Sequence, residues 1–167
     1  MFHTAIRRRA ELINRTLSNR HQMIVTAESC TGGLVAGALT DVPGSSDAVH
    51  GGFVSYANGA KSAMIGVPEE LIREHGAVSE PVARAMAEGA RKVTGVAYAI
   101  AVTGIAGPGG GTEGKPVGLV HFACASETGT VARVERFGDI GRQQVREASI
   151  STALDLVIEC LGVPSPD

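Results

Sequence analysis

Aromatic side chains are scarce in this chain of 167 residues, which has no tryptophan and in which Phe, Tyr and Trp together make up 4%. The hydrophobic fraction is nevertheless 44%, so the core has to be built from Ala, Val, Ile and Leu. Glycine occurs 22 times, which indicates many tight turns. This composition predicts an α/β protein with short buried strands, and the length fits a single domain over residues 1–167.

Cysteine is also sparse, with Cys30, Cys124 and Cys160 and no C-x-x-C spacing. This pattern indicates neither a disulfide framework nor a zinc site, and the five histidines lack the spacing of a metal-binding helix, so no metal and no cofactor are expected. A net charge of -2 argues against a nucleic-acid partner. The sequence shows no signal-peptide pattern and no unbroken apolar run of membrane length, so we expect a cytoplasmic protein without a membrane partner.

Helical and strand patterns both occur along the chain. Helices are expected over residues 3–19, 34–40, 59–65, 68–74, 80–94 and 141–161, and strands over residues 23–27, 50–57, 96–102, 117–125 and 131–137. A turn at residues 127–130 joins the last two strands into an antiparallel hairpin. The expected fold is a three-layer α/β/α sandwich with a mixed sheet that includes this C-terminal hairpin. The small apolar residues of helix 80–94 suit either core packing or an oligomer face, and a homo-oligomer is expected.

Lysine occurs only at positions 61, 92 and 115, against twelve arginines. Lysine can lose its proton near neutral pH in a dry site, whereas arginine cannot. Because Lys61 lies in one segment with Ser46 and Tyr56, the sequence predicts a serine–lysine hydrolase with Lys61 as base, Ser46 as nucleophile and Tyr56 assisting. The Tyr56–Lys61 spacing is one residue longer than the Tyr-x-x-x-Lys pair of short-chain dehydrogenases, which argues against that alternative.

Two glycine-rich turns follow predicted strands, at residues 28–33 and 103–111. Their backbone N–H groups suit an anion, and the two turns form one pocket if both lie at the carboxyl edge of the sheet. The alternative is that the glycines only make tight turns. Residues 109–115 match the P-loop spacing, but a strand rather than a helix is expected to follow, which excludes that motif. The candidate substrate-binding residues in the turns are Thr31, Gly32, Gly33, Thr103, Gly104, Gly107 and Gly109.

Four further side chains have two interpretations each. Ser29 is either a helix N-cap or a hydroxyl that faces substrate, and it is the second candidate for the nucleophile. Cys30 is either a reactive or a packed thiol. Arg142 and Arg146, four residues apart on the last helix, either bind a phosphate or form surface ion pairs.

Four sequence motifs together resemble the C-terminal domain of the competence/damage-inducible protein family CinA. They are residues 27–33 (AESCTGG), 51–61 (GGFVSYANGAK), 76–79 (GAVS) and 103–111 (TGIAGPGGG), in the order of that family. The resemblance covers about residues 5–162 of the sequence.

The resemblance implies a nicotinamide-nucleotide amidase, which hydrolyses nicotinamide mononucleotide to nicotinic acid mononucleotide and ammonia. It implies a serine–lysine arrangement assisted by tyrosine at Ser46, Lys61 and Tyr56, with Ser29 and Thr103 lining the pocket. Where family members often read Gly-Asp-Arg, this chain has two extra residues before Arg142, which leaves Arg142 and Arg146 open for the phosphate. The alternatives are a regulatory nucleotide-binding pocket without chemistry and an interaction module that serves DNA uptake or repair.

Overall fold

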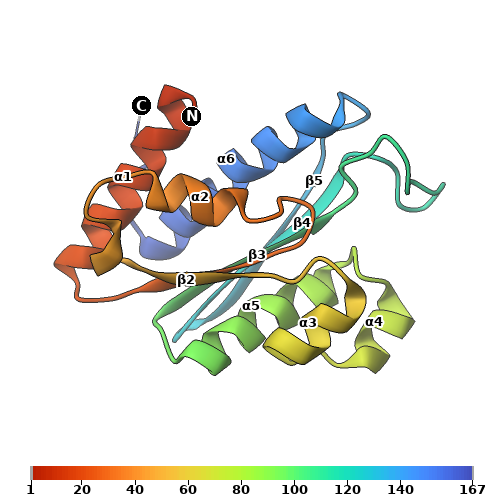
Figure 1. The fold of residues 1–167 in the computed structure, drawn as a ribbon, viewed down its shortest axis with the longest axis horizontal. Coiled ribbons are helices and arrows are strands. Elements are labelled where there is room, and N and C mark those ends of the chain that lie inside the picture. Colours follow the sequence, from red (N-terminus) through yellow and green to blue (C-terminus); the bar gives the residue numbers. More distant parts are fainter. Residues whose placement is uncertain (1, 167) are drawn as a thin grey trace.

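The structure is a computed structural model, and it describes residues 2–166. Its helices and strands follow one another in the order that the sequence predicts (Figure 1). In chain order the elements are α1 (Thr4–Asn19), β1 (Ile24–Glu28), α2 (Leu34–Thr40), the 3-10 helix η1 (Ser45–Asp47), β2 (Val49–Val54), α3 (Asn58–Ile65), α4 (Glu69–His75), α5 (Glu80–Thr94), β3 (Tyr98–Gly104), β4 (Leu119–Ser126), β5 (Gly129–Arg136) and α6 (Arg142–Leu161).

The five strands form one mixed sheet in the order β2-β1-β3-β4-β5. Strand β1 pairs in parallel with both β2 and β3, while β4 is antiparallel to β3 and to β5. The predicted mixed sheet and its C-terminal hairpin are therefore confirmed. Strand β3 begins two residues later than expected, because its pairing with β1 starts where Tyr98 lies opposite Ile24.

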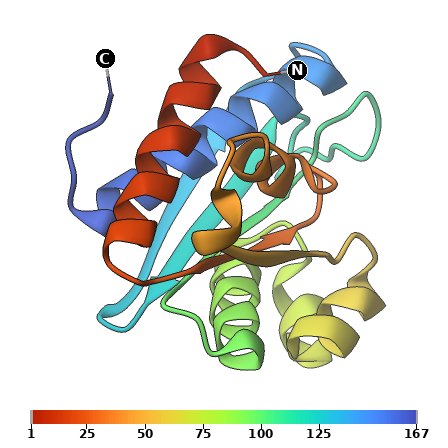
Figure 2. The same cartoon turned by 60° about the vertical axis from the view of Figure 1, so that its left-hand side comes forward.

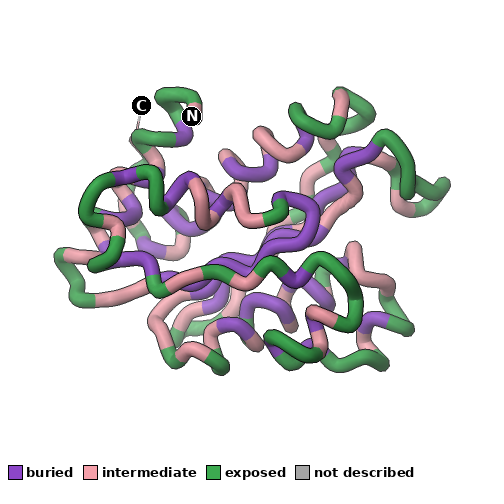
Figure 3. Tube along the Cα trace, in the orientation of Figure 1, coloured by how far each residue is buried: buried purple, intermediate pink, exposed green. Residues whose placement is uncertain are grey.

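Helices cover both faces of the sheet, which confirms the three-layer sandwich (Figures 1 and 2). Helices α1, α2 and α6 lie on one face and α3, α4 and α5 on the other. Two apolar clusters fill the spaces between the layers; Ile13 and Leu154 belong to the first, Ile65 and Met86 to the second. The burial of the central strands is evident in Figure 3. In the described part of the chain no helix is long and apolar enough to cross a membrane.

Helix α5 shows how the sequence sets a local boundary. The Ser79 hydroxyl accepts a hydrogen bond from the Val82 N–H at 3.4 Å, as expected for an N-cap, and Gly95 ends the helix in the left-handed region with φ 71°. The apolar face of α5 packs on the sheet and not toward solvent. Core packing therefore accounts for this helix, and a homo-oligomer stays a prediction.

Helices α3 and α5 approach each other closely at Gly89. A Cβ atom at this position would lie 1.9 Å from the backbone oxygen of Ile65, a distance that no side chain can occupy. The absence of a side chain therefore sets the spacing between α5 and the end of α3.

Candidate functional site

The three parallel strands end at one edge of the sheet, and the loops that follow them meet there. Glu28 at the end of β1 lies opposite Val54 in β2 and Val102 in β3. The two glycine-rich turns therefore lie side by side, as predicted for ligand-binding loops of an α/β sheet. A pocket of about 250 Å³ opens between them, lined by Ser29, Cys30, Tyr56, Gly104, Ile105, Ala106, Gly107, Gly109, Gly110 and Arg142.

Lys61, in α3, is among the largest fully buried side chains of the molecule, with 1% of its surface exposed. Its Nζ atom lies 3.1 Å from the Oγ of Ser29, 2.9 Å from the carbonyl oxygen of Ser55 and 3.2 Å from that of Tyr56. Burial lowers the pKa of Lys61 below its usual 10.5, and the neighbouring Cys30 thiol acts weakly in the opposite direction. The structure holds no carboxylate in an ion pair with Lys61 within residues 2–166.

The three oxygens around Lys61 can accept the three N–H groups of an ammonium, and they are also compatible with a neutral amine. A neutral amine has two N–H donors and one lone pair, whereas an ammonium has three donors. In the neutral form, the two carbonyl oxygens, which can only accept, take both N–H groups. The Ser29 hydroxyl can donate, so it can direct its proton at the lone pair. This arrangement is the one that a lysine base needs in order to activate a serine.

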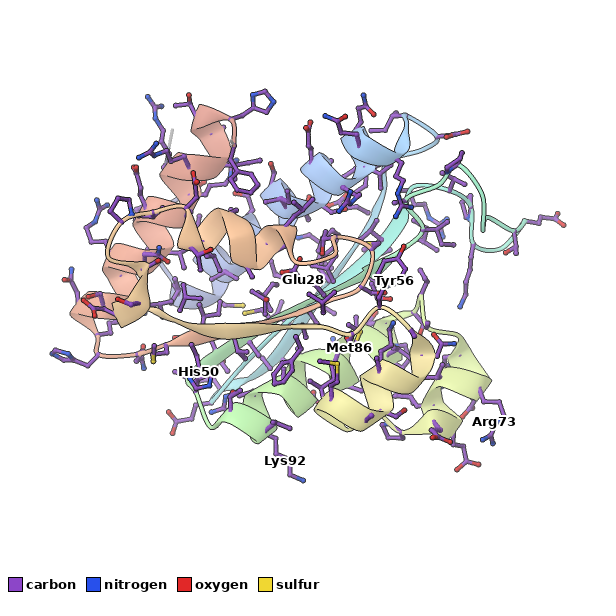
Figure 4. All side chains as sticks on the ribbon, viewed as in Figure 1. Glu28, His50, Tyr56, Arg73, Met86 and Lys92 are labelled. Atoms are coloured by element: carbon purple, nitrogen blue, oxygen red, sulfur yellow. The ribbon has the colours of Figure 1, made fainter. Side chains whose placement is uncertain are left out.

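Ser29, and not Ser46, is the serine beside Lys61. Ser29 follows β1 directly, and its N–H donates to the carbonyl oxygen of Val102 at 2.9 Å, which ties it to β3. Ser46 is exposed in η1, which precedes β2, whereas Lys61 follows β2. In Figure 4, His50 lies near the start of β2 and Tyr56 lies just beyond its end. The expected pairing of Ser46 with Lys61 is therefore corrected, because a strand separates the two residues.

The Cys30 thiol is packed, although the residue borders the pocket. It is 5% exposed, and burial raises its pKa to about 12. Since the thiolate is the nucleophilic form, this environment suppresses the reactivity of the thiol at neutral pH. Of the two interpretations of Cys30, the structure supports the packed one.

Glu28 is a residue that shapes the site and whose role the sequence analysis missed. Its carboxylate is fully buried and accepts three backbone hydrogen bonds, from Gly33 at 3.1 Å, Val35 at 3.0 Å and Ala36 at 2.8 Å (Figure 4). These N–H groups belong to the first turn of α2 and the residue before it, where a helix lacks internal acceptors. Glu28 therefore holds the turn that carries Ser29 against α2. The sequence does place an acidic residue shortly before the start of a helix. A conventional N-cap, however, lies directly before the helix, whereas the glycine turn separates Glu28 from α2.

Tyr56 and Arg142 close one side of the pocket. The Arg142 guanidinium donates to the Tyr56 hydroxyl at 3.1 Å and to the carbonyl oxygen of Gly107 at 3.0 Å. Arg142 is exposed in the first turn of α6, so its remaining N–H groups are accessible to an anion at the pocket mouth. Arg146, one turn further along, does not line this pocket; it donates to the carbonyl oxygen of Thr31 at 3.2 Å.

The glycine turns contain both pocket residues and turn residues. Gly104, Gly107 and Gly109 line the pocket, as expected. Gly32 and Gly33 have φ 59° and 96°, so they make the tight turn that the alternative interpretation proposed.

Two threonines that were predicted to bind substrate are buried beside the pocket rather than in its lining. The Thr103 hydroxyl donates to the carbonyl oxygen of Ala77 at 2.9 Å, which joins β3 to the loop before α5. Thr31 is also buried, and its hydroxyl has no hydrogen-bond partner among the described residues.

Backbone donors lie next to Ser29. Within residues 2–166, neither the N–H group of Cys30 nor that of Thr31 donates to another residue, although the Cys30 N–H interacts with its own thiol. Because Cys30 lines the pocket directly after Ser29, its N–H group has the position of an oxyanion-hole donor. A search of the described residues finds no group of three or more His, Cys, Asp or Glu side chains that could hold a metal ion.

Comparison with known proteins identifies relatives over nearly the whole chain. Residues 6–161 match the CinA C-terminal domain family. A CinA-like protein from Parasynechococcus marenigrum is 51% identical over 147 residues, which are 87% of this chain and 35% of that protein. A CinA-like protein from Anaeromyxobacter sp. (strain K) is 53% identical over 149 residues, 88% of this chain and 36% of that protein. The chain thus spans about a third of the length of these curated relatives.

Solved structures agree with the fold along its length. The competence/damage inducible protein CihA from Agrobacterium tumefaciens has a TM-score of 0.94 at 47% identity, and the match covers 97% of this chain and 98% of that one. A CinA superfamily protein from Escherichia coli has a TM-score of 0.88 at 31% identity, with 93% and 90% covered. These two proteins have the same architecture as the chain described above.

Proposed function

Since this chain belongs to the CinA C-terminal domain family, we propose that it is an amidohydrolase that converts nicotinamide mononucleotide and water to nicotinic acid mononucleotide and ammonia. The observation that carries the proposal is the buried Lys61, whose Nζ lies 3.1 Å from the Ser29 hydroxyl. The motifs shared with the family are the basis for the proposed substrate, and the geometry of the site is the basis for the proposed chemistry.

In the proposed mechanism, neutral Lys61 removes the proton of Ser29 while the Ser29 Oγ attacks the carboxamide carbon. The C–N bond then breaks, the nitrogen leaves as ammonia with the proton taken from Ser29, and an ester to Ser29 remains. Water, deprotonated by Lys61, hydrolyses that ester and restores both residues. An unperturbed lysine would be neutral in only about one molecule in 2,500 at pH 7. The burial that lowers the pKa of Lys61 raises this fraction.

The residues around this pair have supporting roles. The N–H group of Cys30, which lines the pocket, stabilises the negative charge that develops on the carboxamide oxygen. The Tyr56 hydroxyl, which accepts a hydrogen bond from Arg142, relays the Ser29 proton: it gives its own proton to the leaving nitrogen and is reprotonated by Lys61. Arg142 binds the phosphate at the pocket mouth, because it is the arginine that lines the pocket.

The size of the pocket supports partial enclosure of the nucleotide. A volume of about 250 Å³ lies below the range of roughly 300–1,000 Å³ of pockets that enclose a drug-sized ligand. The pyridine ring and carboxamide therefore occupy the pocket beside Ser29, and the ribose phosphate extends toward Arg142.

The test is ammonia release by the purified chain from nicotinamide mononucleotide and, in parallel, from free nicotinamide, each with and without EDTA. The proposal requires turnover of the nucleotide alone, unaffected by EDTA. Binding of the nucleotide without any turnover would instead support a regulatory pocket, and turnover that EDTA abolishes would refute the serine–lysine mechanism.

A further inference from the structure

A second cavity, of about 220 Å³, lies where α1, α2 and the first turns of α6 meet. Phe2, Ile6, Leu34 and Ile150 give it largely apolar walls. It shares no lining residue with the pocket that contains Ser29. It is therefore a separate site, on the other side of the turn at residues 29–33.

Arg146 is the cationic residue on the rim of this cavity that lacks a counter-ion. Its Nη2 donates to the carbonyl oxygen of Thr31, and its Nε is buried without a hydrogen-bond partner. In the part of the chain that the structure describes, no carboxylate forms an ion pair with it. Glu147 also lines the cavity, but its carboxylate accepts a hydrogen bond from Gln143 at 3.1 Å. His3 completes the polar part of the rim.

Arg146 also contacts the turn that carries Ser29. Besides its bond to Thr31, its Nη2 lies 3.3 Å from the position that a Cβ on Gly32 would occupy. Its charge extends to Cys30, where it favours the thiolate and so opposes the rise of the thiol pKa. A change in the position or net charge of Arg146 should therefore alter the turn next to the proposed nucleophile, Ser29.

We propose that this cavity is a regulatory binding site for a small carboxylate on an apolar or aromatic body, held by Arg146. A guanidinium binds a carboxylate with two parallel hydrogen bonds, and the apolar walls accommodate the body of the ligand. The volume lies below the roughly 300–1,000 Å³ of drug-sized sites, so the ligand contains about one ring. Its carboxylate competes with the Thr31 carbonyl for Arg146 and so loosens the turn at residues 29–33.

The test is a titration with benzoate, followed through the backbone amide resonances of the labelled protein, with benzamide as the neutral control of the same shape. We expect benzoate to bind saturably, to shift the amides around Leu34 and Ile150, and to shift those of Ser29 and Cys30 as a second effect. Benzamide should bind at least about tenfold more weakly, because it lacks the charge-assisted bonds to Arg146.

Two variants make the result decisive. Arg146→Gln should weaken benzoate binding about tenfold or more, and the neighbouring Glu147→Gln should strengthen it a few-fold by removing the like charge on the rim. If Arg146→Gln does not fold, the Glu147→Gln comparison still tests the site in a folded protein. Equal binding of benzoate and benzamide, no binding at about 20 mM benzoate, or shifts confined to the Ser29 pocket would each overturn the proposal. The titration requires no turnover, so its outcome is independent of the amidase proposal.

Discussion

The Nζ of Lys61 lies 3.1 Å from the Oγ of Ser29, although the two residues are 32 positions apart in the sequence. The contact exists because β1 and β2 are parallel neighbours in the sheet. Ser29 follows the first strand and α3 follows the second, so both residues reach the same edge. The site thus depends on strand pairing and on the burial of a single lysine.

Substitution of either member of this pair should abolish turnover. We expect Ser29→Ala and Lys61→Met each to lower kcat by at least about a thousandfold, because each removes a group of the same catalytic unit. The measurement is ammonia release under saturating nicotinamide mononucleotide. Ser46→Ala is the matched control: it removes an exposed hydroxyl at the other end of β2 and should keep kcat. Loss of activity in the control with retention in Ser29→Ala would reverse the assignment.

The pH dependence should follow from the lowered pKa of Lys61. In activity, kcat/KM should rise with pH through that pKa as the amine becomes neutral. In stability, the unfolded chain binds more protons at this residue between the folded-state pKa and 10.5, so the free energy of unfolding rises with pH in that window.

Lys61→Met should remove this contribution to the stability profile, as measured by urea denaturation at a series of pH values. The exposed Lys92 provides the control, and Lys92→Met should leave the slope unchanged. An unchanged slope in Lys61→Met would show that the lysine titrates normally in the folded protein.

Alkylation should distinguish the cysteines. The pKa of Cys30 is raised by burial to about 12, so only about one thiol in 100,000 is ionised at pH 7. A hydrogen bond from the Cys124 thiol lowers the pKa of the half-buried Cys160. Iodoacetamide should therefore give one adduct per chain, at Cys160, with activity retained. Peptide mass mapping checks the site, and rapid loss of activity with a Cys30 adduct would contradict the packed environment of that thiol.

Glu28→Gln tests whether the buried carboxylate positions the turn at residues 29–33. The amide group of glutamine cannot accept all three backbone hydrogen bonds, so we expect a loss of about 1–3 kcal/mol in the free energy of unfolding. If the turn shifts Ser29, kcat should fall while KM changes little. Activity is measured at a temperature at which the variant is folded. If the variant is less stable but has the same kcat as the parent there, Glu28 has only a structural role.

Arg142→Gln should separate phosphate recognition from chemistry. We expect KM for nicotinamide mononucleotide to rise at least about tenfold, since a charge-assisted contact is lost. Nicotinamide riboside, which has no phosphate, provides the comparison, and its kcat/KM should change much less. An equal loss for both substrates would indicate that Arg142 acts mainly through its hydrogen bond to Tyr56.

The fold was predictable because its determinants are local. Helical periodicity placed α1 and α5 correctly, and Ser79 marked the start of α5. The site was less predictable, because it depends on which strands are neighbours. One strand stands between Ser46 and Lys61, and its six residues at roughly 3.3 Å each put the flanking segments at opposite edges of the sheet. The strand predicted over residues 50–57 is therefore itself an argument against a contact between Ser46 and Lys61. The role of Glu28 depends on backbone N–H groups whose orientation only the folded turn defines.

The position of Lys61 in the site also depends on Gly89, a residue that does not line the pocket. The first methyl group added there would collide with the carbonyl oxygen of Ile65, in the last turn of the helix that carries Lys61. Because α5 packs on the sheet, the displacement would fall on α3 and move the Lys61 amine away from Ser29. A position with no chemical function is in this way restricted to glycine by the geometry around the reacting groups.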